Sequence, residues 1–348
     1  MKKRLLTGDR PTGALHLGHY VGSLANRITA QEEYECFFII ADIHTLTTRP
    51  QKKHISDLKE NIHKMVLEYL SVGINPDKST IFVQSLIPET FELNTILEML
   101  VSVPRLERIP SLKEMTIAAD LKTQPFGLLG YPVMMAADIL LPRAELVPVG
   151  ADNRANLELA RELARRFNRM YDAIFPIPDF QIEGTLIGTD GQAKMSKSLD
   201  NAIFLTDDAP AVEHKVMSMF TDPNRLSADT PGRVEGNPVF LYHDAFNSDH
   251  DEIAELKERY RGGKVGDVDV KKKLVRVLND FLDPIRERRN QLEGDPDLVN
   301  DVLAHGIHRM RLEAQETILM VREAMDLPSY AYAKALQGVE PVRGLALV

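Results

Sequence analysis

The segment that most constrains the fold spans residues 11–20 and contains the tetrapeptide His16-Leu-Gly-His19. It follows the short apolar run Leu5-Leu6 and leads into an amphipathic helical pattern. A strand, a glycine-bearing turn and a helix beginning near Leu17 would present free backbone N–H groups and the positive end of the helix to an anion. The two histidines are three residues apart, so both rings would share one helix face and could donate to phosphate oxygens. The segment therefore predicts a phosphate-binding turn.

A second motif, Lys194-Met-Ser-Lys197-Ser198, lies far along the chain in a segment that also contains Gly191. Two lysines and two small hydroxyl residues near a glycine predict a mobile cationic loop, which suits a polyphosphate whose charge must be balanced during a reaction. In most proteins a lysine-rich loop, or a pair of histidines at a helix start, is only solvated surface. The two motifs in this order and at this distance are hard to obtain by chance, which favours a functional interpretation of both.

The first half of the chain alternates apolar runs with helical patterns, which is typical of a parallel α/β sheet. A mononucleotide would bind at the carboxyl ends of such strands, near the turn from Gly8 to Gly13. Neither G-x-G-x-x-G nor G-x-x-x-x-G-K-[ST] occurs, which disfavours dinucleotide dehydrogenases and P-loop enzymes. We expect strands at residues 4–7, 35–41, 80–84 and 146–149, and helices at 17–31, 55–72, 89–101, 112–121, 131–141 and 154–168.

The second half loses its strand signals after about residue 210 and shows only helical patterns separated by turns. We expect these helices at residues 211–220, 239–247, 252–260, 268–293 and 297–325. The chain is therefore predicted to have an α/β catalytic domain over residues 1–208, an α-helical domain over 209–330 and a short tail over 331–348.

Composition narrows the class of protein. The formal net charge of −9 argues against a protein that coats nucleic acid non-specifically, because phosphate binding depends on lysine and arginine. No apolar run approaches the roughly 20 residues of a membrane helix, so we expect a cytoplasmic protein. The single cysteine, Cys36, lies in an apolar run and is expected to be a buried small hydrophobe. Local basic stretches remain candidates for RNA contacts; they lie at residues 161–169, 257–264, 271–276 and 286–289.

The pattern at residues 131–141 is apolar nearly all round and should be buried, yet it carries the carboxylate of Asp138. Burying an ionised aspartate is costly unless a donor satisfies it. The donor can belong to the protein or to a ligand, and a ligand is the sharper explanation. Further on, Gly150 would let a ligand approach the backbone, whereas Asp152 is either a helix N-cap or a ligand-facing residue.

The two motifs resemble the "HIGH" and "KMSKS" elements of class I aminoacyl-tRNA synthetases. The segments at residues 131–141, 147–150 and 157–168 are similar to those of the bacterial tryptophanyl-tRNA synthetases, and the likeness extends over residues 4–325. It implies a Rossmann-like catalytic domain and a helical domain that reads the anticodon. In this family the aspartate that matches Asp138 accepts the indole N–H, and the methionine that matches Met135 packs on the ring.

The resemblance also implies the remaining site residues. The tryptophan pocket would be completed by His44, Leu6, Val147 and Val149. The catalytic residues would be His16, His19, Lys194 and Lys197. The ATP site would comprise Arg10, Pro11, Thr12, Gly18, His19, Gly150, Ala151, Asp152, Lys194, Met195, Ser196, Lys197 and Ser198.

The implied reaction has two steps: tryptophan and ATP give tryptophanyl-adenylate and pyrophosphate, and the tryptophanyl group then passes to the 3′ end of tRNA(Trp). Magnesium is expected to arrive with ATP, bound mostly to phosphates and water, and no protein metal site is expected. The family also implies a homodimer, whose interface we expect in the irregular segment at residues 103–125. An additional protein partner stays open.

The chain departs from the family in several places. Asn153, Ala155 and Asn156 stand where members usually have Gln, Gln and His. Leu6 replaces an aromatic residue, and Ala41 and Thr12 also differ from the usual pattern. Most of these changes alter or shorten side chains around the substrates, which predicts a roomier indole pocket that tolerates ring-substituted tryptophan, as in auxiliary second-copy enzymes.

Other functions stay possible at this point. A tyrosyl-tRNA synthetase or a small nucleotidylyltransferase also uses an H-x-G-H motif, although nucleotidylyltransferases are generally shorter. A synthetase-like binding or regulatory protein would keep the fold without its chemistry. The intact histidines, lysines and Asp138 favour an active tryptophan enzyme.

Overall fold

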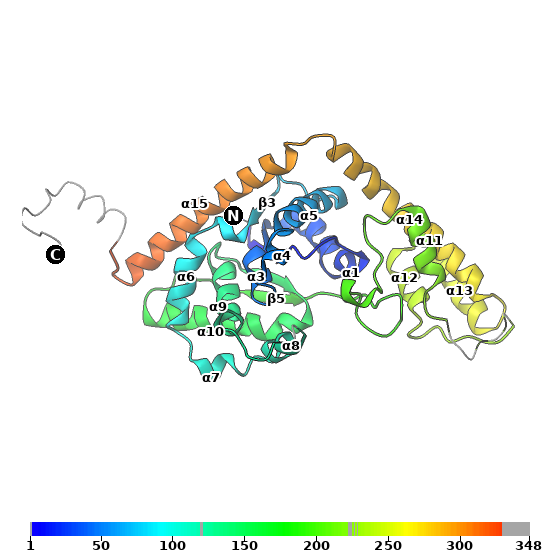
Figure 1. The fold of residues 1–348 in the computed structure, drawn as a ribbon, viewed down its shortest axis with the longest axis horizontal. Coiled ribbons are helices and arrows are strands. Elements are labelled where there is room, and N and C mark those ends of the chain that lie inside the picture. Colours follow the sequence, from blue (N-terminus) through cyan, green and yellow to red (C-terminus); the bar gives the residue numbers. More distant parts are fainter. Residues whose placement is uncertain (1, 119–120, 222–224, 226, 228, 329–348) are drawn as a thin grey trace, which may run out of the picture.

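Five parallel strands form one sheet in the order β3-β2-β1-β4-β5 (Figure 1). The computed structural model describes residues 2–118, 121–221, 225, 227 and 229–328. The strand order reverses between β1 and β4, the point at which open α/β sheets bind ligands. The predicted α/β fold with a Rossmann-like sheet is therefore confirmed. The strands are β1 (Arg4–Asp9), β2 (Glu35–Ile40), β3 (Ser79–Val83), β4 (Leu146–Val149) and β5 (Asp179–Ile182).

Alternate residues of the strands enter two separate cores, as the period of two in a strand requires. On β2, Cys36 and Phe38 face one core, while Phe37 and Ile39 face the other. Both faces are covered by helices, which explains why β2 is apolar from Cys36 to Ile40. Cys36 is buried, as predicted.

Each of the six helices predicted in the catalytic half has a counterpart in the structure, although the ends differ and the short helices α3 (Asp42–Leu46) and α7 (Val103–Leu106) were not predicted. They are α1 (Leu17–His19), η1 (Tyr20–Leu24), α2 (Ala25–Glu33), α3 (Asp42–Leu46), α4 (Lys52–Ile55), α5 (Leu58–Val72), η2 (Gln84–Leu86), α6 (Glu89–Glu98), α7 (Val103–Leu106), α8 (Pro110–Ala118), α9 (Phe126–Leu140), η3 (Ala151–Asn153), α10 (Arg154–Met170) and η4 (Lys197–Leu199). The helix expected at 17–31 is continuous but contains a π turn, η1. The helix expected at 55–72 is broken between α4 and α5.

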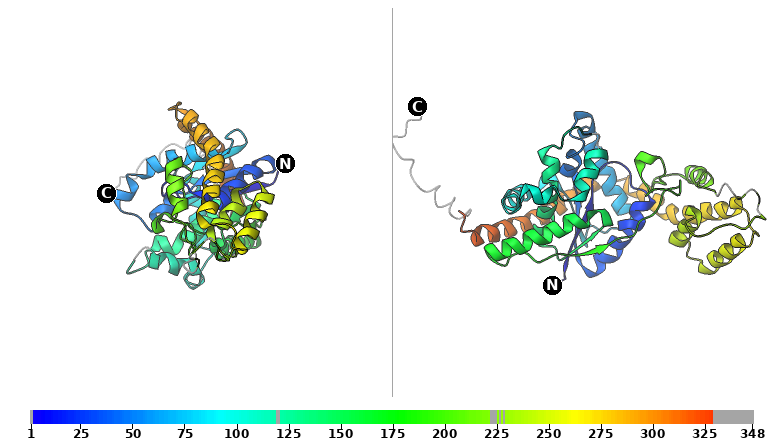
Figure 2. Two further views of the ribbon diagram at one scale, coloured as in Figure 1. Left: turned by 90° about the vertical axis from the view of Figure 1, so that its right-hand side faces the viewer. Right: turned by 90° about the horizontal axis from the view of Figure 1, so that it is seen from below.

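The last part of the chain is helical, as expected, and consists of α11 (Ala209–Met217), α12 (Pro238–Phe246), α13 (His250–Arg261), α14 (Asp267–Leu292) and α15 (Leu298–Ala324). Helices α11 to α13 and the first half of α14 project to one side of the sheet (Figures 1 and 2). One apolar core runs from the sheet through α5 into these helices, because Phe38, Met65, Leu278 and Phe240 all belong to it. In the part of the chain that the structure describes, no helix has the length and apolarity needed to cross a membrane.

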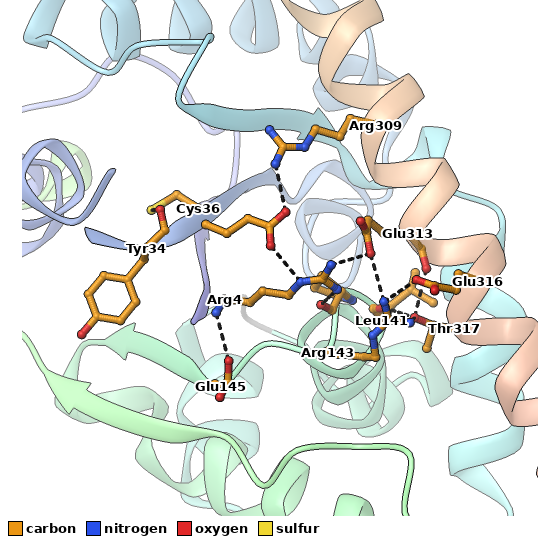
Figure 3. Close-up of polar contacts among 12 residues, drawn as sticks. Arg4, Tyr34, Cys36, Leu141, Arg143, Glu145, Arg309, Glu313, Glu316 and Thr317 are labelled. Carbon is orange, nitrogen blue, oxygen red and sulfur yellow. Dashed lines mark hydrogen bonds and ion pairs between the residues drawn. The ribbon is translucent and has the colours of Figure 1, made fainter. Parts of the chain in front are cut away.

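Helix α15 returns to the sheet and packs across β3. At the crossing, a Cβ added to Gly306 would lie 1.8 Å from the Ile81 carbonyl oxygen, so only glycine permits this approach. Farther along the helix, Glu313 pairs with Arg4 of β1 at 2.8 Å and with Arg143 at 3.1 Å (Figure 3). The segment predicted as the helical domain, 209–330, thus includes a helix that lies against the catalytic sheet. The tail predicted at 331–348 lies outside the described residues.

Candidate active site

The turn after β1 has the geometry of an anion site. The chain leaves β1 at Asp9 and turns at Gly13, whose φ of 118° is a conformation that favours glycine. The rings of His16 and His19 lie together, with centroids 3.7 Å apart, as their spacing predicts. The backbone N–H of His16 donates to Nδ1 of His19 at 3.1 Å, so a neutral His19 ring carries its proton on Nε2 and can donate it elsewhere.

Both histidines are held neutral by their surroundings. Burial, together with His19, Lys197 and Lys194, lowers the pKa of His16 to about 3. Burial also lowers the pKa of His19 to about 4, although Asp9 opposes the effect. The two rings therefore act as neutral hydrogen-bond donors rather than as cations near pH 7.

The lysine loop lies over this turn. Met195 is buried, and its sulfur accepts the backbone N–H of Gly18 at 3.2 Å. Lys197 Nζ lies 3.5 Å from the position that a Cβ on Gly13 would occupy. Burial lowers the pKa of Lys197, whereas Glu68 and Asp9 raise it. The structure thus brings the two motifs together, as predicted.

The rest of the loop is arranged around Asn201. Its side-chain oxygen accepts the backbone N–H of Ser196 at 2.8 Å. Lys194 is exposed, and Ser198 lies within η4. The lysine that approaches the turn is therefore Lys197, while Lys194 keeps its ammonium group in solvent.

The opposite wall of the switch point is formed by the turn after β4. A Cβ on Gly150 would lie 2.5 Å from Oδ1 of Asp152, so the carboxylate folds back over the glycine. Ala151 and Asp152 are exposed there. The N-cap of α10 is Asn153, which excludes the interpretation of Asp152 as that cap.

The aspartate of α9 is buried and half satisfied. Asp138 is 5% exposed, and its Oδ2 accepts from Nε2 of His44 at 2.8 Å and from Nε2 of Gln84 at 2.7 Å. Its other oxygen, Oδ1, has no hydrogen-bond partner among the described residues. A carboxylate with one oxygen fixed and the other open is a preorganised acceptor for a donor that a ligand would bring.

The apolar residues predicted for the pocket lie in the core that includes the neighbouring side chains of α9. Leu6, Val147 and Val149 are buried in the same core, and Met135 packs against it, half-buried. The four apolar residues of the predicted pocket therefore belong to, or pack against, one core that includes side chains of β1, β4 and α9.

A second polar group in this region was not predicted. The hydroxyl of Tyr131 is 2.6 Å from Oγ of Ser111 and accepts from Nδ2 of Asn156 at 3.1 Å. The Tyr131 ring meets His44 edge-on at 6.1 Å. Gln84 was also missed, although a polar residue at the carboxyl end of a buried strand was a usable signal.

Comparison with known proteins decides the family. The family described as tRNA synthetases class I (W and Y) matches residues 1–283. The tryptophan–tRNA ligase of Treponema pallidum (strain Nichols) is 60% identical over 93% of this chain and 97% of its own length. This chain belongs to the class I tRNA synthetases for tryptophan and tyrosine. Another relative, the tryptophan–tRNA ligase of Borreliella burgdorferi, is 57% identical over 94% of each chain.

A solved structure in this family has the same fold. Tryptophanyl-tRNA synthetase from Campylobacter jejuni, complexed with ADP and tryptophan, superposes with a TM-score of 0.82 at 34% identity, covering 93% of this chain and 100% of its own. The nucleotidylyltransferase alternative does not explain a likeness over this length.

The neutral histidines generate a prediction about pH. The imidazole ¹⁵N chemical shifts of His16 and His19 should stay constant between pH 5 and 8, because their pKa values of about 3 and about 4 lie below this range. NMR with labelled histidine measures this, and His16→Gln and His19→Gln assign the signals. A titration of either ring with a midpoint between pH 6 and 7 would contradict the assignment.

The same shifts affect stability. The unfolded chain binds protons on these histidines near pH 6.5, while the folded chain does not. The free energy of unfolding should therefore fall as the pH is lowered from about 6.5 towards 3, and the fall should be smaller in His16→Gln.

Proposed function

We propose that this class I synthetase is a tryptophan–tRNA ligase. It activates L-tryptophan with ATP to give tryptophanyl-adenylate and pyrophosphate, and then transfers the tryptophanyl group to the 3′ end of tRNA(Trp). Relatives named tryptophan–tRNA ligase that are 60% and 57% identical over nearly the whole chain support this reaction.

The observation that carries the proposal is the open oxygen of Asp138. The indole N–H of tryptophan is a donor with no acceptor function, which fits Oδ1 of an aspartate whose neighbours on α9 belong to an apolar core. Phenylalanine has no such donor and would leave the carboxylate unpaired. A site built around a buried acceptor rejects ligands that lack the donor by about 10⁴- to 10⁵-fold.

The first step is an in-line displacement at the α-phosphorus of ATP. The carboxylate of tryptophan forms the new P–O bond, and the bond to the bridging oxygen breaks to release pyrophosphate. In the second step a ribose hydroxyl of the tRNA attacks the carbonyl carbon, and AMP leaves. Neither step needs a protein nucleophile, so catalysis consists of positioning and charge stabilisation.

The two motifs supply that stabilisation. His16 and His19 donate to phosphate oxygens as neutral rings, and the Gly18 N–H joins them by exchanging its weak sulfur acceptor for a phosphate oxygen. Lys194 and Lys197 neutralise the departing pyrophosphate. The remaining nucleotide contacts assigned by resemblance are Arg10, Pro11, Thr12, Gly150, Ala151, Asp152, Met195, Ser196 and Ser198. Magnesium enters as part of the substrate, held by ATP phosphates and water.

Binding tRNA requires a basic surface. The structure distinguishes basic stretches whose side chains pair within the protein from one whose arginines do not. Lys257 pairs with Asp244 at 2.5 Å, and Lys273 pairs with Glu252. The three arginines at residues 286–289 make contacts within the protein: Arg286 with Asp207, Arg288 with Ser71 and Arg289 with Glu68. By contrast, Arg165, Arg166 and Arg169 at the end of α10 have no hydrogen bond or ion pair with any residue that the structure describes.

These three arginines line an open hollow of about 400 Å³, together with Glu162 and Met170. Guanidinium groups recognise phosphates in pairs of parallel hydrogen bonds. We assign this surface, the α10 arginine surface, to the phosphate backbone of tRNA.

The homodimer is proposed from exposed apolar side chains. Met99, Ile117 and Phe126 are 75%, 79% and 73% exposed, and all lie in or beside the segment at residues 103–125 where we expect the interface. A second copy of the chain is the occupant that the family resemblance implies, and covering these side chains would stabilise the pair.

Several finer points rest on the resemblance alone. We propose a catalytic domain over residues 1–208, an anticodon-reading helical domain over 209–330 and a cytoplasmic location.

We also propose that Ala41, Asn153 and Asn156 leave room for ring-substituted tryptophan. ATP–pyrophosphate exchange that depends on 5-hydroxytryptophan would support this enlarged pocket. If 4- and 5-substituted tryptophans give no exchange while tryptophan does, the enlarged pocket is wrong. An auxiliary role and a further protein partner stay hypotheses.

Asp138→Asn should lower kcat/KM for tryptophan in ATP–pyrophosphate exchange by roughly 100-fold, because a neutral amide oxygen is a weaker acceptor than a carboxylate. The exposed Asp251→Asn on α13 is the matched control and should leave it unchanged. Unchanged kcat/KM in Asp138→Asn would remove Asp138 from its role. Exchange that depends on tyrosine instead of tryptophan would overturn the proposed function.

The triple change of Arg165, Arg166 and Arg169 to Gln should raise KM for tRNA at least about tenfold and weaken its salt dependence, because fewer phosphates are neutralised. ATP–pyrophosphate exchange, which needs no tRNA, should not change. The control is Lys257→Gln with Arg259→Gln and Arg261→Gln, whose side chains pair within the protein. An unaltered KM for tRNA rules out the α10 arginine surface.

Sedimentation velocity should give twice the mass of one chain for the wild type and one chain mass for Met99→Asp with Phe126→Asp, since burying two carboxylates is costly. Leu312→Asp places the same charge at another exposed apolar residue, on α15, and should remain dimeric. A monomeric wild type refutes the dimer.

A further inference from the structure

The basic stretch at residues 286–289 is not an RNA contact in this structure but the junction between α14 and the catalytic half. The second half of α14 packs against α5 (Figure 1). Arg288 Nη1 donates to the Ser71 carbonyl on α5 at 2.6 Å, and Arg286 Nε donates to the Asp207 carbonyl at 2.8 Å. These arginines tie α14 to the body that carries the active site.

The third arginine of this stretch faces a buried carboxylate. Arg289 Nη1 lies 3.9 Å from Oε1 of Glu68, and this buried nitrogen has no hydrogen-bond acceptor among the described residues. Glu68 lies on α5 and is 2% exposed. A charge in such a place requires compensation from its neighbours.

The other oxygen of Glu68 reaches the phosphate-binding turn. Its Oε2 accepts the backbone N–H of Leu15 at 2.9 Å, and Leu15 directly precedes His16. Leu15 is itself buried and pairs through its carbonyl with the backbone N–H of Leu205, beyond the lysine loop, at 3.0 Å. One carboxyl group therefore spans the distance from α14 to the start of the histidine motif.

We propose that Glu68 is a positioning residue that couples α14 to the phosphate-binding turn, with one oxygen on the Leu15 amide and the other facing Arg289. This role rests on the proposed function, since the turn it positions binds ATP. The sequence contains no motif around Glu68, and only the packing of α14 on α5 reveals it.

The charge of Glu68 is finely balanced, which makes the coupling measurable. Burial raises the pKa of its carboxyl to about 7, although the Leu15 N–H, Arg289, Lys197 and Lys64 all lower it. These cations come from α14, the lysine loop and α5 itself. The ionised form makes the stronger bond to the Leu15 amide and balances Lys197, so it is the form that favours catalysis.

The Leu15 amide provides a readout that does not depend on activity. In the full-length protein with ¹⁵N-leucine, the Leu15 amide signal should titrate with a midpoint near pH 7. Glu68→Gln, which keeps an acceptor but cannot ionise, should abolish the titration. Arg289→Met should raise the midpoint by roughly one unit, because the carboxylate loses a cation.

The matched control is Arg288→Met, which removes a neighbouring contact of α14 without facing Glu68. It should leave the midpoint in place even if it lowers stability. A Leu15 signal that does not titrate between pH 5.5 and 8.5, or a midpoint that moves equally in both arginine variants, overturns the coupling.

Exchange kinetics then separate this role from a merely structural one. Glu68→Gln should lower kcat for ATP–pyrophosphate exchange by roughly tenfold, with KM for tryptophan unchanged, and its rate should lose the rise through pH 7 seen in the wild type. Parallel losses in kcat and in tryptophan affinity would contradict it. If the wild type shows no tryptophan-dependent exchange, the proposed function fails, while the Leu15 titration still tests the coupling.

Discussion

The active site depends on a short stretch of backbone pairing between segments that are far apart in the sequence. Leu17 donates its N–H to the Ile203 carbonyl at 2.9 Å, and Leu205 donates to the Leu15 carbonyl at 3.0 Å. Ile203 and Leu205 are buried in the core that also holds Leu15 and Leu17. This pairing fixes the point at which the chain leaves the lysine loop next to the start of the histidine motif.

Two carboxylates in the catalytic half, the half-buried Asp9 and the buried Asp138, differ in how completely the protein satisfies them. Asp9 pairs with Arg27 at 2.8 Å and accepts from the Tyr69 hydroxyl at 2.7 Å. Burial alone would raise the pKa of Asp9, but Arg27, His19 and Tyr69 together bring it below its usual value. Asp9 is thus a satisfied charge beneath the turn. Asp138 is satisfied on one oxygen only, and that difference marks it as a binding residue.

Hydrophobic periodicity predicted those strands and helices whose pattern of buried residues can be recognised within a single segment of the sequence. The four apolar strands were found, because alternate or continuous burial leaves a signal in a single segment. Strand β5 was missed because three of its four residues are exposed, and its place is set by pairing with β4. The position of α15 could not be predicted either, since an amphipathic helix specifies that it packs but not against which surface.

The sequence likewise predicted some residues of the site and missed others. His16, His19 and Asp138 stand out by residue type within an apolar or helical context, and the structure shows the paired histidine rings and the buried aspartate that the sequence led us to expect. Gln84 and Tyr131 act through contacts between elements, which one sequence does not display. The stretch at 286–289 has the composition of an exposed basic face, yet each of its three arginines makes a contact within the protein.

The core that runs from Phe38 through α5 to Leu278 and Phe240 has a consequence for how the molecule comes apart. Side chains that share one core lose their packing together, so the helices that project from the sheet gain no separate melting transition. Amide hydrogens in the middle of α14 should exchange as slowly as those of β2. Replacing these helices by another module would expose the apolar side chains of the catalytic half that share this core. The helical half is therefore hard to exchange as an independent unit in evolution.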